Sequence, residues 1–372
     1  MVNDKTDDAI YRELQEHLDK LPVGFPRSDS GAEIRVLKFI FTPKEAQIAA
    51  NLSRSLETAQ VIHARISKLG MTVQELGEAL DMMVSKGGIN FKEERGRKFY
   101  ANVPFVIGMY DHQVKRMTRQ FFKDVLKYDL ESFSAELFGT KIPQLRTIPM
   151  EASITPQHYI SRYDELRKIV ETSDGPFSVQ ECVCRKAMSL IDRPCKKTSR
   201  KETCIALGSE DESGVKVYID QGWGREITRE ECLEVLHKNE EDGLVLQVGN
   251  SERPGFICSC CGDCCGFLAG FNMMPKPVDF ASSNYQAEVN AGLCAGCKTC
   301  VERCPMGAVK VVDDVAKVDL NRCIGCGLCV PTCEAKAMHL VKKDKQVTPP
   351  KTRDDLLTSV MNKRNEIRQR RV

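Results

Sequence analysis

The distribution of cysteine constrains this chain more than any other feature, because all 18 cysteines lie between Cys182 and Cys333. The residues up to Leu18 are charged and contain no apolar core followed by a cleavage site, and the chain has no apolar run long enough to span a membrane. We therefore expect a cytoplasmic protein without a membrane span. In a reducing compartment, closely spaced thiols are expected to bind metal rather than to form disulfides.

The last eight cysteines form an internal repeat. The pattern Cys-x-x-Cys-x-x-Cys-x-x-x-Cys begins at Cys294 and begins again at Cys323. Three thiolates at this spacing can reach three corners of an iron–sulfur cubane, and the fourth cysteine of each copy is expected to bind the other cluster. Zinc sites, in contrast, use two pairs of ligands and do not require a third cysteine at the same spacing. The predicted ligands are Cys294, Cys297, Cys300 and Cys333 for cluster one, and Cys323, Cys326, Cys329 and Cys304 for cluster two.

This segment resembles the bacterial ferredoxins that bind two [4Fe–4S] clusters. Its glycines at 296, 325 and 327 would let backbone N–H groups approach the sulfur atoms, and strands are expected at 308–312 and 337–341. The resemblance implies one-electron transfer at low potential. The sequence departs from the family at Glu334, where proline usually follows the last cysteine, so the cluster that includes Cys333 is expected to differ in potential.

Nine further cysteines are candidate metal ligands, because neighbouring thiolates repel one another or oxidise unless a metal binds them. They are Cys182, Cys184, Cys195, Cys204, Cys258, Cys260, Cys261, Cys264 and Cys265. We expect one or two further iron–sulfur clusters. The alternatives are a tetrahedral zinc site at Cys182, Cys184, Cys195 and Cys204, and a redox-active dithiol at Cys264–Cys265. The simplest division places the first four in one centre and four of the last five in another; mixed sets remain open. Cys232 stands alone and is interpreted as a buried structural thiol.

The N-terminal region has the pattern of three helices followed by a β-hairpin. Helices are predicted over 43–52, 58–69 and 72–86, with a Thr72-x-x-Glu75 capping box opening the third, and a hairpin over 89–101. This order resembles winged helix-turn-helix domains, a resemblance that implies DNA binding. The would-be recognition helix, however, carries three acidic residues and only one basic residue. Since a DNA-reading helix should be neutral or basic, we expect protein docking or a structural role instead.

A basic segment follows the first pair of cysteines. Seven basic residues face one acidic residue here, and the basic residues are Arg185, Lys186, Arg193, Lys196, Lys197, Arg200 and Lys201. The segment is either a solvated loop or a docking patch for an acidic redox partner. The basic tail at 346–372 is expected to form a helix packed on the body of the protein or on a partner subunit. Phosphate-binding glycine motifs are missing, so no nucleotide site is predicted.

Taken together, the sequence predicts a multidomain α+β protein. Its expected parts are a winged-helix-like domain at 1–110, an irregular cysteine-rich region at 111–285, a ferredoxin-type domain at 286–345 and a helical tail. This three-part arrangement resembles iron–sulfur proteins of anaerobic bacteria. The predicted function is electron transfer within an oxidoreductase complex, rather than catalysis by this chain alone. Two alternatives are a redox-sensing DNA-binding regulator and an enzyme that binds substrate at an open upstream cluster.

Overall fold

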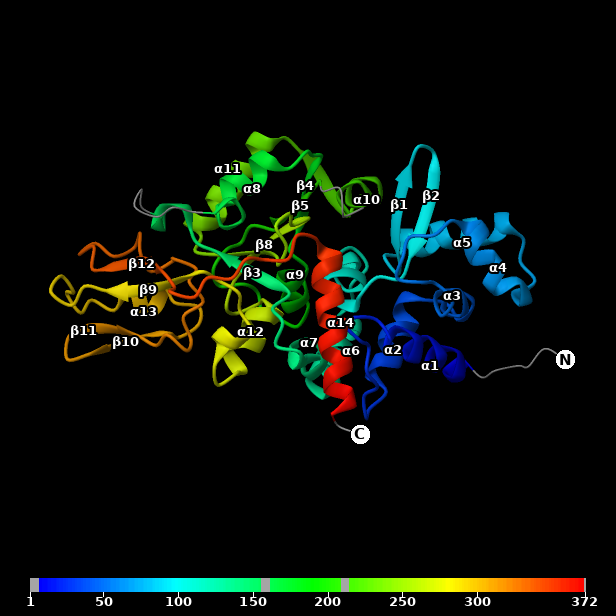
Figure 1. Ribbon diagram of the computed structural model, residues 1–372, viewed down its shortest axis with the longest axis horizontal. Helices are drawn as coiled ribbons and strands as arrows, with labels where there is room; N and C mark the ends of the chain where they lie inside the picture. Colours follow the sequence, from blue (N-terminus) through cyan, green and yellow to red (C-terminus); the bar gives the residue numbers. More distant parts are fainter. Residues whose placement is uncertain (1–6, 155–160, 209–213, 371–372) are drawn as a thin grey trace. The chain divides into compact units, whose positions relative to one another are not determined.

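The computed structural model describes residues 7–154, 161–208 and 214–370 (Figure 1). The chain divides into two compact units. Unit 1 comprises residues 1–140, 220–223 and 357–372, and unit 2 comprises residues 141–219 and 224–356. The boundary expected near residue 110 therefore falls inside unit 1, and every cysteine of the chain lies in unit 2.

Unit 1 is mostly helical. Its α-helices are α1 (Asp7–Leu18), α2 (Ala32–Ile40), α3 (Pro43–Ala49), α4 (Ala59–Ile66), α5 (Val73–Ser85), α6 (Arg119–Tyr128) and α7 (Ser134–Gly139). The capping box predicted at the start of α5 is present, because the Thr72 side chain accepts from the Glu75 backbone N–H and Glu75 accepts in return from the Thr72 N–H. Thr42 and Glu45 form a second capping box at α3.

The hairpin predicted after the third helix is also present. Strands β1 (Asn90–Glu94) and β2 (Arg97–Ala101) pair in antiparallel register, and Arg95 and Gly96 both adopt positive φ at the tip. Figure 1 shows this hairpin as two long cyan strands beside α5. The three helices and the hairpin thus occur where the sequence predicts them. The winged-helix resemblance itself stays a prediction.

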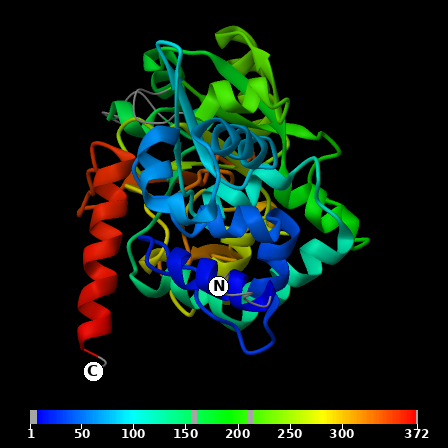
Figure 2. The same cartoon turned by 90° about the vertical axis from the view of Figure 1, so that its right-hand side faces the viewer.

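Aromatic packing and one buried cation stabilise unit 1. Phe25, Phe105, Tyr128 and Phe133 pack against one another with ring centroids 4.7–5.8 Å apart. The predicted tail helix is α14 (Arg353–Gln369), which Figure 2 shows as one unbroken helix. Its buried Arg364 pairs with Asp19 at 2.8 Å and also with Glu136.

Unit 2 contains a six-stranded antiparallel sheet in the order β3-β7-β8-β5-β4-β6. The strands are β3 (Leu145–Ile148), β4 (Phe177–Glu181), β5 (Glu202–Leu207), β6 (Gly224–Ile227), β7 (Val245–Gly249) and β8 (Phe256–Cys260). The expectation of an irregular region at 111–285 is therefore wrong. Each strand is only four to six residues long, and cysteine, serine or glycine interrupts most of the apolar runs, so the sequence pattern is weak although the sheet is regular.

The two faces of this sheet have different chemistry, because successive side chains of a strand point to opposite faces. On one face, Val179, Ile205 and Ile257 belong to a buried apolar core that also includes residues of α8 (Leu166–Thr172) and α11 (Arg229–Glu241). On the opposite face, β5 presents Cys204 and β8 presents Cys258 and Cys260. The sheet thus has an aliphatic face and a cysteine face.

The ferredoxin-type segment consists of two small antiparallel pairs and one short helix. Strand β9 (Tyr285–Val289) pairs with β12 (Met338–Lys342), and β10 (Val309–Val312) pairs with β11 (Val315–Val318). The strands predicted at 308–312 and 337–341 are confirmed to within one residue at each end. Helix α13 spans Thr299–Arg303. No helix among the described residues is both long and apolar enough to cross a membrane.

Candidate metal centres

The eight C-terminal cysteines lie in two groups, and each group draws on both copies of the repeat. A single pocket is lined by the four cysteines that the spacing assigns to cluster one: Cys294, Cys297, Cys300 and Cys333. Within the second group, Cys304 lies near enough to Cys323, Cys326 and Cys329 for its charge to raise the pKa of all three thiols, after the larger effect of burial. The exchange of the fourth cysteine is what two clusters of this type require.

Backbone N–H groups point at the sulfur atoms of both groups. The Ala316 N–H donates to Cys294 Sγ at 3.3 Å, and the Ala308 N–H donates to Cys304 Sγ at 3.3 Å. In the second group, the Ala287 N–H of β9 donates to Cys323 Sγ at 3.4 Å. Such donors stabilise the negative charge of thiolates and of a bound cluster, so the donor set of this segment fits [4Fe–4S] binding.

Glycine is required at position 325 of the second cysteine loop. Gly325 has φ +68°, and a Cβ at this position would lie 2.2 Å from the Tyr285 carbonyl oxygen and 2.5 Å from Ser283 Oγ. Gly296 has the equivalent conformation in the first loop, with φ +64°. The expected approach of the loop backbone to sulfur is seen at Gly325, because burial raises the pKa of the Cys323 thiol and a hydrogen bond from the Gly325 backbone opposes this rise.

The two groups differ in solvent exposure. Cys297 of the first group is exposed, whereas Cys323 and Cys329 of the second are each only 8% exposed. Burial raises the pKa of Cys329 to about 12, with smaller contributions from the nearby Cys323 and Cys304. Cys300 of the first group is likewise only 8% exposed, so the first group reaches solvent through Cys297.

Six of the nine upstream cysteines form a closed ring of hydrogen-bonded thiols. The ring runs through Cys182, Cys184, Cys265, Cys260, Cys258 and Cys204, and returns to Cys182. Three members come from the cysteine face of the sheet. Since Ile205 pairs with Ile257 and Ala206 with Phe256, the antiparallel register places the preceding residue of β5, Cys204, beside Cys258.

The other three ring members come from the starts of two helices. Cys182 is the N-cap residue of α9 (Val183–Leu190), and Cys184 lies in the first turn of that helix. Cys265 is the N-cap residue of α12 (Gly266–Met273). The partial positive charge at a helix N-terminus favours thiolate, which is the form of cysteine that binds metal.

Every second thiol of the ring is stabilised as a thiolate. Hydrogen bonds from Cys204 and Cys260 lower the pKa of Cys258 to about 6. Hydrogen bonds from their ring neighbours also lower the pKa of Cys182 and of Cys265. A ring of six thiols in the interior of the unit fits a bound metal cluster, because thiolate ligands and cations neutralise one another.

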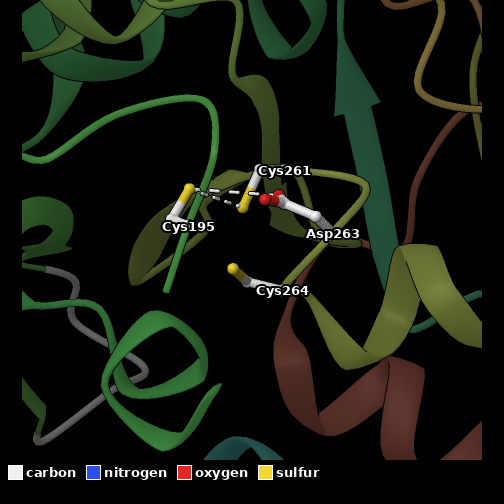
Figure 3. Close-up of side chains that lie close together, drawn as sticks. All are labelled: Cys195, Cys261, Asp263 and Cys264. Atoms are coloured by element: carbon white, nitrogen blue, oxygen red, sulfur yellow. Dashed lines mark hydrogen bonds between the residues drawn. The ribbon is translucent and has the colours of Figure 1, made fainter. Parts of the chain in front are cut away.

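The remaining upstream cysteines form a separate group. The ligand atoms of Cys195, Cys261, Asp263 and Cys264 all lie within 4.8 Å of one another. In Figure 3 these four side chains point toward a common centre, with Cys195 coming from one loop and the other three from a single turn. The simplest division of the upstream cysteines is therefore wrong, because Cys195 joins the 261–264 turn while Cys182, Cys184 and Cys204 join the ring. Asp263 is a candidate ligand that the sequence analysis missed.

Arg185 does not belong to an exposed docking patch, which corrects the sequence prediction. Its side chain is buried, and its guanidinium donates to the Ser259 carbonyl at 3.0 Å, to the Thr203 hydroxyl and, more weakly, to Cys261 Sγ at 3.9 Å. Desolvation lowers the pKa of Arg185, but the combined attraction of Cys182, Cys204 and Cys261 raises it. Arg185 is thus a buried cation that offsets negative charge in both the ring and the smaller group.

The rest of the basic segment is more accessible. Arg193, Lys196, Lys197 and Lys201 are exposed. Arg200 is partly buried and pairs with Asp242 at 2.7 Å, and Lys186 pairs with Glu181 at 3.1 Å. Four residues of the predicted patch are therefore exposed.

Cys232 is fully buried in the aliphatic core of unit 2, and burial raises the pKa of its thiol to about 12. We expect this thiol to stay protonated at neutral pH and to react with iodoacetamide only after the protein is denatured. Mass spectrometry of labelled peptides measures this directly. Labelling of Cys232 at the same rate before and after denaturation would contradict the assignment of a structural thiol.

Comparison with known protein families supports the C-terminal part of this description. Residues 293–342 match the family model of the 4Fe–4S dicluster domain. The searches of curated proteins and of solved structures found no significant match. The C-terminal segment is therefore a ferredoxin-type iron–sulfur domain, and this domain is the basis for inferring the function.

Proposed function

We propose that this chain passes single electrons through a series of iron–sulfur clusters, as a subunit or partner of an oxidoreductase complex. The match of residues 293–342 to a dicluster domain carries this proposal. In this proposal the eight C-terminal cysteines hold two [4Fe–4S] clusters, as their spacing predicts, and the six-thiol ring holds a further iron–sulfur cluster. Each bound cluster would take up or release one electron at a time.

The connection between the ring and the second cysteine group supports a continuous route. Asn272 lies on α12, whose N-cap is the ring residue Cys265. Its side-chain amide donates to the Pro305 carbonyl at 3.0 Å and accepts from Arg322 at 3.0 Å. These two partners directly follow Cys304 and directly precede Cys323. One residue therefore joins the ring helix to both halves of the proposed cluster-two site.

A second contact brings the turn of the smaller group equally close. A Cβ built on Gly262 would lie only 3.1 Å from the Pro305 carbonyl oxygen, so this glycine packs directly on the residue after Cys304. The proposed series of clusters begins at the exposed Cys297 and ends at the ring. Its order is solvent, cluster one, cluster two and ring. This order suits exchange with a partner at the surface and onward transfer through the unit.

The proposal is tested on protein purified without oxygen. The measurements are the iron content, the acid-labile sulfide content and the number of electrons that each chain takes up. Two [4Fe–4S] clusters require about eight irons per chain, and a cubane in the ring raises the count to about twelve. Reductive titration should then show uptake of one electron per cluster, with the signals of reduced clusters in electron paramagnetic resonance. Zinc in place of iron at the eight C-terminal cysteines would exclude electron transfer as the function.

For unit 1 we propose docking to a protein rather than to DNA. In addition to the acidic residues of α5, the hairpin residue Lys98 is paired with Asp81 at 2.7 Å, which removes positive charge from the face that a DNA-binding wing would use. Retardation of random DNA in a gel at low salt would instead support the redox-sensing regulator.

The exposed basic residues provide a test of partner docking. Lys196→Glu combined with Lys197→Glu is expected to slow electron exchange with an acidic flavodoxin about tenfold at low salt, because charge steering is lost. The difference should disappear at high salt, where charges are screened. Lys216→Glu with Lys238→Glu changes the net charge equally at exposed sites of unit 2 outside the basic segment and is the matched control. Equal rates for the two double variants at low salt would exclude docking at this loop.

A further inference from the structure

We propose that Cys195, Cys261, Cys264 and Asp263 bind a single zinc ion, in a site separate from every iron–sulfur cluster of the chain. The inference goes beyond electron transfer and does not depend on it, because it concerns one redox-inert ion held by four side chains. It also changes the composition expected from the sequence, which favours iron at all upstream cysteines.

The spacing of the ligand atoms fits one tetrahedral ion. Cys195 Sγ lies 3.5 Å from Cys261 Sγ and 3.9 Å from Asp263 Oδ1. Around a tetrahedral zinc with Zn–S bonds of about 2.3 Å, two sulfur atoms are separated by about 3.8 Å. The observed distances therefore fit four ligands that converge on one centre.

The surroundings hold these ligands in the orientation that metal binding requires. The Lys196 N–H donates to Asp263 Oδ2 at 2.7 Å, which leaves Oδ1 facing Cys195. The Lys197 N–H donates to Cys195 Sγ at 3.4 Å, and Arg185 donates to Cys261 Sγ at 3.9 Å. Outer-shell donors of this kind fix the ligands of metal sites and tune their affinity. Three of the four ligands thus have such a donor.

The donor set also favours zinc on chemical grounds. Three thiolates and one carboxylate complete a four-coordinate site, and a closed tetrahedral site is typical of structural zinc. These ligands carry four negative charges, of which the ion neutralises two. The buried guanidinium of Arg185 offsets a third, so the site is close to balanced in charge.

The ion would have a mechanical role. Cys195 lies in the loop that carries the exposed Lys196 and Lys197, whereas the other three ligands lie in the turn between β8 and α12. That turn is flanked by the ring residues Cys260 and Cys265. Zinc would therefore fasten the basic loop to the rigid part of unit 2 that holds the ring.

The test is the metal content of the full-length protein, purified without oxygen and measured for zinc and iron together. The wild type should contain about one zinc per chain. Cys195→Ala and, separately, Asp263→Ala should lose most of this zinc after dialysis against a chelator and keep the wild-type iron content. Cys232→Ala removes a thiol outside both groups and should keep both metals, so it is the matched control.

Cobalt provides a second measurement, in case a variant folds poorly. Protein prepared with Co²⁺ should show the visible absorption of tetrahedral cobalt–thiolate coordination, and Cys195→Ala should abolish it while the circular dichroism stays unchanged. Loss of iron instead of zinc in Cys195→Ala would overturn the proposal, as would unchanged zinc in both ligand variants. Absence of iron from the eight C-terminal cysteines would refute electron transfer but leave this proposal standing.

Discussion

Cys323→Ala is expected to remove about four irons per chain, because a cubane that loses one of its thiolate ligands is no longer held by four corners. Cys323 is 8% exposed and its Sγ accepts from the Ala287 N–H of β9, so the side chain is fixed in the interior of the domain. Because metal binding and folding are coupled, we also expect a lower melting temperature. Anaerobic iron analysis and thermal unfolding measure the two effects.

Cys232→Ala is the control for this prediction, since it removes a buried thiol that belongs to neither cysteine group. This variant should keep the full iron content even if the loss of core packing lowers its stability. Wild-type iron content in Cys323→Ala would contradict the ligand assignment of cluster two and with it the exchange of the fourth cysteine between the copies.

Gly325→Ala is expected to destabilise unit 2 by about 3 kcal/mol or more, from left-handed backbone strain together with overpacking. A Cβ at this position would lie 2.2 Å from the Tyr285 carbonyl oxygen, and a backbone atom of a strand cannot move aside easily. We expect the variant to lose iron from cluster two as well. Denaturant unfolding of anaerobic protein, with iron analysis of the same samples, gives both quantities.

Gly307→Ala separates the two causes. Gly307 also has a positive φ, +57°, but no atom lies within 4 Å of the position of its missing Cβ. The Gly307→Ala variant should therefore lose only about 1 kcal/mol of stability, from backbone strain, and should keep its iron. Equal effects of the two substitutions would show that close approach to β9 is unimportant.

The parts of the molecule that could be predicted from the sequence are those set by local spacing. The repeat at Cys294 and Cys323 assigns ligands within short loops, and the Thr72–Glu75 capping box marks the start of α5 within one turn of helix. The ring and the smaller group depend instead on tertiary structure. Cys204 meets Cys258 only through the register of β5 against β8, and Cys195 meets Cys261 only because a loop folds back across the chain.

The roles of Asp263 and Arg185 in the candidate centres could not be predicted from the sequence pattern. Asp263 lies between Cys261 and Cys264, but a carboxylate beside thiols is common and does not by itself indicate a ligand. Arg185 begins a run of basic residues, and such a run predicts an exposed side chain. Its burial follows from its position on α9, one turn after Cys182, where its guanidinium donates to the Ser259 carbonyl of β8.

The aliphatic face of the six-stranded sheet has a consequence for biogenesis. Val179, Ile205 and Ile257 are packed among apolar residues and Cys232, none of which belongs to a candidate metal centre, so the sheet can form while the protein is still free of metal. Iron would then bind to thiols that strand pairing has already placed. Folding of this sheet would not depend on metal binding, in contrast to a zinc-finger peptide, which folds only when zinc binds. If the ring holds a cluster as proposed, its iron would therefore bind to a sheet that has already folded.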